Sequence, residues 1–224
     1  MLKPFFSYFG SKYRIAHRYP NPRYDLIVEP FAGSAGYSLL YFDKAVLLVD
    51  ASELIIGLWQ YLIDVKESEI RKLPVNILEI EGIQVCQEAK WLIGFWITQA
   101  QSTPSPRAWG FHARRFGWNE AIRDRVAGQL QYIRHWVARQ GSYERILNSP
   151  ATWYVDPPYE KAGKRYKNRI TDYKQLGDWC KTREGQVIVC EAEGARWLPF
   201  KPMLSNLNGS GKFYKEILWT SNKG

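Results

Sequence analysis

The sequence predicts one α/β domain in which helices pack against an open sheet. Four short apolar runs have the length and composition of buried strands, at Tyr24–Glu29, Ala45–Val49, Thr152–Val155 and Gln186–Cys190. Elsewhere along the chain, apolar residues recur at helical spacing. The 224 residues are enough for one such domain with a sizeable core. We expect a single domain over residues 1–224, with a small helical and loop insert at about 84–140.

The protein is basic and rich in aromatic residues. Its formal net charge is +9 and its pI is about 9.4, with ten Trp and fourteen Tyr. Positive charge neutralises phosphates and flat rings stack on bases, so this composition favours a nucleic-acid partner. A basic protein whose rings lie in its core would have the same composition.

The cysteines and the N-terminus indicate a compartment. Cys86, Cys180 and Cys190 lack metal-ligand spacing and cannot all pair with each other, so free thiols in a reducing cytosol are the simplest account. The N-terminus has no apolar signal core, and no apolar run approaches the roughly 20 residues that span a bilayer. We expect a soluble, cytoplasmic protein.

The most informative stretch is the Asp-Pro-Pro-Tyr turn, residues Asp156, Pro157, Pro158 and Tyr159, which follows the apolar run Thr152–Val155. The two prolines remove backbone donors and restrict the dihedral angles of the turn. At the carboxyl end of a strand, such a turn faces the ligand crevice of an open α/β sheet. A carboxylate, acceptor carbonyls and a flat ring suit a planar substrate with an exocyclic amine. The alternative is a rigid turn with a buried Tyr.

A second turn, the Gly-rich turn Pro30–Gly36, follows the strand that ends at Glu29. Its small residues allow a ligand to approach the backbone, and a helix starting near Ser34 would offer free N–H groups. It matches neither the P-loop nor the dinucleotide fingerprint. The next strand is followed by Asp50, which is placed to accept hydrogen bonds from a ribose. Together these features predict a nucleoside-bearing ligand.

The N-terminal segment carries a third motif. Gly10 permits a left-handed turn, and Ser11 can cap a short helix from Lys12 to about Arg18. Lys12 would then place a cation in the first turn, where it opposes the helix dipole. Such a cation either meets an anionic ligand or is simply exposed.

Three stripes at helical spacing are expected to be core rather than cofactor contacts. Ser52 caps the first helix and Asn119 caps the third. The stripes comprise Ile55, Leu58, Trp59 and Leu62; Val85, Ala89, Leu92, Ile93 and Trp96; and Ile122, Val126, Leu130, Ile133 and Val137.

Two basic segments are candidates for nucleic-acid contact. Gln101–Trp118 combines arginines with aromatic rings and resists regular structure, so it suits a DNA-reading loop or a loop folded back on the core. Glu160–Arg169 places five cations in ten positions beside the Asp-Pro-Pro-Tyr turn and suits phosphate contact or a solvated surface. The cations are Arg107, Arg114 and Arg115 in the first segment and Lys161, Lys164, Arg165, Lys167 and Arg169 in the second. Aromatic residues of the first segment are Trp109, Phe111, Phe116 and Trp118.

The C-terminal third predicts one more helix and further strands. The helix runs from about Thr171 to Cys180 and precedes the strand Gln186–Cys190. Two further strand candidates, Trp197–Leu204 and Lys212–Trp219, are joined by Asn208–Gly211, a plausible hairpin connection.

The motifs and their order resemble those of the Dam-like DNA N6-adenine methyltransferases. Tyr8–Lys12 resembles the N-terminal cofactor motif of that family, and Glu29–Gly36 resembles its Gly-rich S-adenosylmethionine loop. Asp156–Tyr159 matches its catalytic signature, and Lys215–Asn222 resembles its C-terminal strand. Together these stretches span nearly the whole chain.

The resemblance implies a Rossmann-like S-adenosylmethionine-dependent methyltransferase fold, with a mostly parallel seven-stranded sheet and a reversed C-terminal hairpin. It implies a cytoplasmic bacterial or phage enzyme of DNA adenine methylation, as in restriction-modification, whose insert at about 84–140 recognises the target. Two departures are Gly10-Ser11-Lys12 in place of Gly-Gly-Lys, and Ser142 where the family often has an acid near the cofactor adenine. The implied cofactor-site residues are Tyr8, Gly10, Lys12, Glu29, Pro30, Phe31, Ala32, Gly33, Ser34, Asp50, Ser142 and Tyr143.

The implied chemistry fits the Asp-Pro-Pro-Tyr turn. Hydrogen bonds from an adenine N6 to the Asp156 carboxylate and the Pro157 carbonyl would stabilise the positive charge that grows on that nitrogen, and Tyr159 would stack on the extruded base. This chemistry requires neither a nucleophilic cysteine nor a metal. The same turn suits N4 of cytosine or adenine in RNA, and a nucleic-acid-binding protein that lost catalysis is the alternative of a different class.

Overall fold

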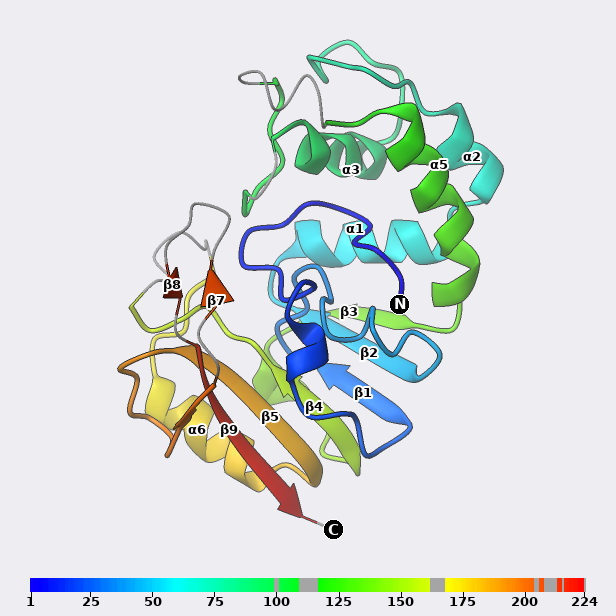
Figure 1. The fold of residues 1–224 in the computed structure, drawn as a ribbon. Helices are drawn as coiled ribbons and strands as arrows, with labels where there is room; N and C mark the ends of the chain where they lie inside the picture. The colour runs from blue at the N-terminus through cyan, green and yellow to red at the C-terminus, as the bar shows by residue number, and fades with distance from the viewer. Residues whose placement is uncertain are drawn as a thin grey trace.

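A computed structural model of the protein describes residues 1–98, 101–108, 117–161, 168–203, 206–207, 213–214 and 216–223. In this part of the chain, seven strands form one sheet in the order β3-β2-β1-β4-β5-β9-β6 (Figure 1). The strands are β1 (Leu26–Glu29), β2 (Ala45–Asp50), β3 (Val137–Gln140), β4 (Ala151–Val155), β5 (Gly185–Ala192), β6 (Lys201–Pro202) and β9 (Glu216–Lys223).

Five neighbouring strands, from β3 through β5, run parallel. The strand β9 is antiparallel to both of its neighbours, β5 and β6. This order and direction confirm the predicted Rossmann-like methyltransferase fold, including the reversed C-terminal strand. A separate two-stranded antiparallel sheet pairs β7 (Asn206–Leu207) with β8 (Phe213–Tyr214), and the predicted connection at 208–211 lies outside the described residues.

The central strands carry core residues on both faces, as their apolar runs predict. All five residues of β4 are buried. Tyr154 joins one hydrophobic cluster with α1 (Glu53–Asp64), while Trp153 and Val155 join a second cluster with α6 (Tyr173–Thr182). Alternation of side chains along a strand explains this division. Helices therefore cover both faces of the sheet.

The helix caps follow the sequence prediction. The Ser52 side chain accepts a hydrogen bond from the Ile55 N–H at the start of α1, and Asn119 accepts one from the Ile122 N–H at the start of α5 (Glu120–Gln129). All four residues of the first predicted stripe are buried. In the second, α3 (Gln87–Ile97) buries Ala89, Leu92 and Ile93.

A group of helices stands beyond α1, at the top of Figure 1. It contains α2 (Glu67–Lys72), α3 and α5, with α3 packed on α1 and α2 on α5. Trp118 lies in the core of this group, 2% exposed, and its indole N–H donates to the Pro74 carbonyl. The expectation that Trp118 is a stacking ring of a DNA-reading loop is therefore wrong.

The helices predicted to start near Ser34 and to run from Lys12 to about Arg18 do not form. No helix starts near Ser34, because Ala35 has a φ of 51°, a left-handed conformation that an α-helix excludes. Instead of capping a helix from Lys12 to Arg18, Ser11 accepts a hydrogen bond from the Ser34 hydroxyl. Only a 3₁₀ turn, η1 (Ala16–Arg18), forms there. A segment this short is a marginal helix, and its Lys12 side chain is bound to Asp156, 144 positions away.

The third stripe is also shorter than predicted. The helix α5 ends at Gln129, and Leu130 and Ile133 lie in the following 3₁₀ turn η2 (Leu130–Ile133). Val137 begins β3, pairs with Leu47 at the edge of the sheet and is 44% exposed. In the tail, the described residues of the strand predicted over Trp197–Leu204 end at 203, and among them only β6 is a strand.

Within the described ranges, none of the helices has the length and apolar character needed to cross a membrane.

Gly36 offers a test of how closely the N-terminal segment packs on the Gly-rich turn. A Cβ at this position would lie 2.7 Å from the Tyr13 backbone nitrogen and 3.0 Å from that of Lys12. We expect Gly36→Ala to lower the free energy of unfolding by about 1–3 kcal/mol, measured by denaturant titration.

The matched control is Gly128→Ala in α5, where an added Cβ meets nothing within 4 Å. It should raise the free energy of unfolding by up to about 1 kcal/mol, because alanine is the better helix former. Equal stabilities of Gly36→Ala and the unmodified protein would show that this packing is loose.

Candidate active site

A cavity of about 750 Å³ opens at the carboxyl ends of the parallel strands. Its lining includes Phe31–Ser34, which follow β1, Asp50 at the end of β2, and Asp156, which follows β4. The strands β1 and β4 are neighbours, and the order of strands along the chain reverses between them. Ligands of open α/β sheets bind at such a position. The structure thus brings the Gly-rich turn and the Asp-Pro-Pro-Tyr turn to one cavity.

Glu29, the last residue of β1, is buried behind the Gly-rich turn. One oxygen of its carboxyl group accepts hydrogen bonds from the backbone N–H and the hydroxyl of Ser38, at 2.8 and 2.6 Å. Burial raises the pKa of Glu29 to about 8, and the hydrogen bonds from Ser38 oppose the rise. Glu29 is therefore mainly protonated at neutral pH, and its contacts fix the chain that follows the Gly-rich turn.

Asp50 orders the Gly-rich turn from the neighbouring strand. Its two carboxylate oxygens accept hydrogen bonds from the N–H groups of Gly33 (3.2 Å) and Ser52 (2.9 Å). Gly33 has a φ of +43°, and a Cβ there would lie 3.1 Å from the Tyr8 ring. The indole N–H of Trp59 donates to the Gly33 carbonyl. This part of the cavity is a fixed backbone surface that a ligand can approach closely.

Two aromatic rings and a pair of polar residues line the far side of the cavity. The rings of Phe31 and Tyr143 lie 5.5 Å apart. Ser142 caps the short 3₁₀ turn η3 (Tyr143–Arg145), and its hydroxyl donates to the carboxylate of Glu144. Glu144 also accepts a hydrogen bond from Gln175 at 2.6 Å. The cavity therefore has an acid two residues after Ser142, which the sequence interpretation did not identify.

Asp156 forms an ion pair with Lys12 inside this cavity. The ammonium nitrogen lies 2.7 Å from Oδ1 and 2.8 Å from Oδ2 of Asp156, and 3.1 Å from the Gly10 carbonyl oxygen. The side chains are 10% and 19% exposed, so both ions have lost most of their water. Burial lowers the pKa of Lys12, but the surrounding groups, first Asp156 and then Glu216, together raise it above its ordinary value, so the ammonium stays charged. Burial raises the pKa of Asp156, and Lys12 opposes that rise.

Tyr159 is 8% exposed and packs behind this pair. Its hydroxyl donates to Oε1 of Glu216 at 2.7 Å, and the Lys12 ammonium lies 4.8 Å from the centre of its ring. The buried Tyr159 ring therefore agrees with the alternative expectation, a rigid turn with a buried Tyr. A base that stacked on the ring face under Lys12 would have to displace the ammonium.

The Asp-Pro-Pro-Tyr turn is held by two further contacts. The hydroxyl of Tyr173 donates to the Pro158 carbonyl at 2.5 Å. Glu191, near the end of β5, accepts hydrogen bonds from the backbone N–H of Glu160 and the indole N–H of Trp197, both at 3.2 Å. Rigid support of this kind fixes where the Asp156 carboxylate points.

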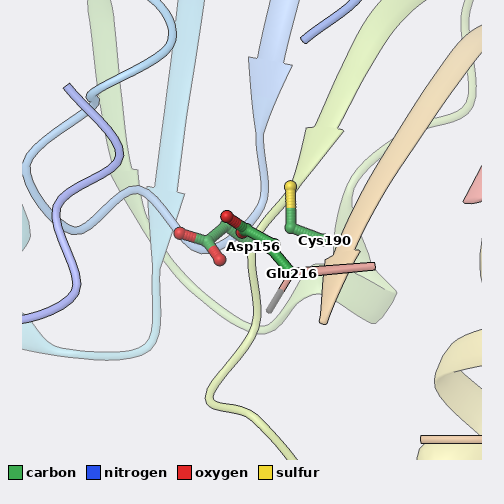
Figure 2. Close-up of side chains that lie close together, drawn as sticks. All are labelled: Asp156, Cys190 and Glu216. Atoms are coloured by element: carbon green, nitrogen blue, oxygen red, sulfur yellow. The ribbon is translucent and has the colours of Figure 1, made fainter. Parts of the chain in front are cut away.

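Asp156, Cys190 and Glu216 form a cluster of the kind that can hold a metal ion, with one ligand atom of each within 4.8 Å of the others (Figure 2). Figure 2 shows the two carboxyl groups side by side with the Cys190 sulfur next to them. The Lys12 ammonium already supplies a positive charge here. Burial, together with Glu216 and Asp156, raises the pKa of Cys190 well above its usual value, so the thiol stays protonated. These features favour an internal ion pair over a metal centre.

The predicted DNA-contact residues fall in three groups. Arg107 is 59% exposed and forms an ion pair with Glu79 at 2.7 Å, so this carboxylate already balances part of its charge. Lys161 is exposed, and Arg169 lines the cavity. The other residues predicted to contact DNA lie outside the described residues: Arg114, Arg115, Lys164, Arg165 and Lys167.

Glu29 gives a prediction about stability. Because its pKa in the folded protein lies above the usual 4.5, the unfolded chain releases this proton first. Release of this proton from the unfolded chain should therefore lower the free energy of unfolding as the pH rises from about 4.5 to about 8, by at most about 1.4 kcal/mol per pH unit. Glu29→Gln should lack this part of the pH dependence in denaturant titrations at pH 5 and pH 8. Identical pH dependence of the two proteins would contradict a buried, protonated Glu29.

Comparisons with known proteins add no family: neither a protein-family model nor a curated protein matches the chain in sequence. The resemblance to the adenine methyltransferases therefore consists of the four motifs, and the structure adds the order of the strands in the sheet.

Proposed function

We propose that this protein transfers the methyl group of S-adenosylmethionine to the N6 amino group of adenine in DNA. One observation carries the proposal: the Asp156 carboxylate and the Gly-rich turn line the same cavity, at the position in the sheet where ligands bind. A cavity of this size can hold a nucleoside cofactor beside part of a second ligand.

The residues around the Gly-rich turn suit S-adenosylmethionine. The cofactor would supply an electrophilic methyl group on a sulfonium sulfur. The fixed backbone at Gly33, the remaining lone pairs of Asp50 and the rings of Phe31 and Tyr143 would hold its nucleoside part. Tyr8, which contacts Gly33, and the carboxylate of Glu144 complete that side of the cavity.

Asp156 suits an amine acceptor. The lone pair of an adenine amino group is delocalised into the ring, so the nitrogen is a poor nucleophile. A hydrogen bond from N6 to Asp156 would favour a pyramidal nitrogen and stabilise the positive charge that develops on it. The Tyr173 hydroxyl donates to the Pro158 carbonyl, and the Pro157 carbonyl would accept the second N6 proton.

A DNA substrate accords with the charge of the chain. The net charge of +9 favours a polyanion and would make binding sensitive to salt. A base inside a duplex cannot reach the cavity, so it would have to leave the stack at a cost of a few kcal/mol. Contacts with Asp156 and Tyr159 would offset part of that free energy.

The direct test is incubation of the purified protein with tritiated S-adenosylmethionine and duplex DNA, followed by nucleoside analysis. Label in N6-methyladenine is the expected result. Label in N4-methylcytosine, or label only with an RNA substrate, would keep the chemistry and change the substrate. DNA binding without label would favour a nucleic-acid-binding protein without catalysis.

Asp156→Asn should reduce methylation by on the order of 100-fold or more, because the neutral amide cannot balance the charge on the amine. Binding of S-adenosylmethionine, measured by calorimetry, should change by less than about threefold, because other residues would hold the cofactor. A variant with normal turnover would remove Asp156 from the mechanism.

Asp25→Asn is the matched control. Asp25 also pairs with a lysine, Lys44, at 2.7 Å, but its side chain is 99% exposed and it lies before β1, away from the cavity. This variant should retain full methylation.

A further inference from the structure

The Lys12 ammonium occupies the position that a substrate amine needs. Its three N–H donors have three acceptors at bonding distance: the Gly10 carbonyl and both carboxylate oxygens of Asp156. It also lies over the face of the Tyr159 ring. If the proposed function holds, a base can bind to Asp156 only when Lys12 gives up at least one of these oxygens.

Glu216 is the second carboxylate beside Lys12. Its side chain has 0% exposure, and its Oε1 lies 3.9 Å from the ammonium nitrogen while accepting the Tyr159 hydroxyl. No described residue donates a hydrogen bond to its Oε2. Burial raises the pKa of Glu216, and the nearby buried hydroxyl of Tyr19 opposes the rise, although it makes no hydrogen bond of normal geometry. A buried carboxylate oxygen without a donor is unfavourable and uncommon.

A small displacement would join these two features. The ammonium would have to approach Glu216 by about 1 Å to form a normal hydrogen bond. It could keep its bond to Gly10 and one bond to Asp156 while exchanging the other Asp156 oxygen for a Glu216 oxygen. The number of hydrogen bonds at Lys12 would not change, and one oxygen of Asp156 would become available.

We propose that Glu216 is a positioning residue of the amine site: it holds the Tyr159 hydroxyl and is the second acceptor to which Lys12 moves when a substrate amine takes its place at Asp156. The inference rests on the proposed function and assigns a role to a residue outside the Asp-Pro-Pro-Tyr turn.

The exchange has an electrostatic consequence for the reaction. A carboxylate fully paired with an ammonium has little net field to offer an amine that is becoming positive. When Lys12 is shared between Asp156 and Glu216, the charge of Asp156 is only partly balanced at close range. Glu216 would then aid methyl transfer without touching the substrate.

A purely structural role for Glu216 makes different predictions. If Glu216 only anchors Tyr159, Glu216→Gln should be tolerated, because the amide oxygen can still accept the hydroxyl, and the shorter Glu216→Asp should be damaging. If its charge receives Lys12, the order reverses. We expect Glu216→Gln to lower turnover at least 10-fold and Glu216→Asp to retain more turnover than Glu216→Gln, with unchanged affinity for S-adenosylmethionine in both.

A stability cycle in the protein without substrate tests the second acceptor independently of activity. In Asp156→Asn, Lys12 can pair with Glu216, and in Glu216→Gln it keeps Asp156, so each single variant should fold. The double variant leaves a buried ammonium with no carboxylate. Its fall in melting temperature should exceed the sum of the two single falls, or it should fail to fold while both single variants fold.

Additive falls in melting temperature, or failure of Asp156→Asn to fold, would show that Glu216 is not a second acceptor for Lys12. Turnover of Glu216→Gln equal to that of an active unmodified protein would overturn its role in the reaction. An unmodified protein that methylates nothing while the stability cycle is non-additive would instead reject the proposed function and leave Glu216 as the alternative partner of Lys12.

Discussion

The ion pair between Lys12 and Asp156 is the interaction on which the site depends. It joins residues 144 positions apart and holds the N-terminal segment over the carboxyl edge of the sheet. The hydrogen bond between Ser34 and Ser11 and the close approach of Gly36 to the backbone of Tyr13 fix the same segment. Because both ions have lost most of their water, separating them without a replacement partner is strongly unfavourable. Any ligand at Asp156 must therefore be accommodated together with Lys12.

The reversed strand of the sheet explains how Glu216 reaches this pair. Parallel strands bring their last residues to one edge, where Glu29, Asp50 and Asp156 lie. An antiparallel strand brings its first residue to that edge instead. Glu216 begins β9 and pairs with Ala192 at the end of β5. The topology thus places Glu216 of the C-terminal strand beside Asp156, which follows a central strand. It also brings Glu216 to Tyr159, which lies 57 positions away in the sequence.

The parts of the structure that were predictable from the sequence are those set by local patterns. Apolar runs identified the central strands, and Ser52 and Asn119 marked the starts of helices because capping depends on near neighbours. The helix predicted at Ser34 failed at Ala35, whose backbone is left-handed, a conformation that the sequence pattern does not mark at an alanine. Val137 continued a helical stripe in the sequence, but it pairs with β2 in the fold.

The site was predictable in its members but not in its pairings. The sequence indicated that Lys12 could meet an anion, and the anion it meets is Asp156 of the same chain. It also indicated a ring at Tyr159, but not that a carboxylate would hold the hydroxyl. Glu216 lay within a recognised motif without an assigned role, and Glu144 carried no local signal. The contacts of Tyr159 with Glu216 and of Lys12 with Asp156 join residues 57 and 144 positions apart, and neither helical periodicity nor turn composition indicates such contacts.

The acids around the cavity differ in what their surroundings allow them to do. Glu29 is held by Ser38 and mainly protonated, and Asp50 is engaged with the N–H groups of Gly33 and Ser52. Asp156 and Glu216 differ from these two acids, because the described ion pairs bring both of them the same cation, Lys12. Burial raises the pKa of both carboxyl groups, and the Lys12 ammonium opposes the rise in each, which favours the charged carboxylates. Carboxylate oxygens favour a cation or a nitrogen that becomes positive over an anionic acceptor. The oxygen of Asp156 that Lys12 would release is therefore suited to an amine.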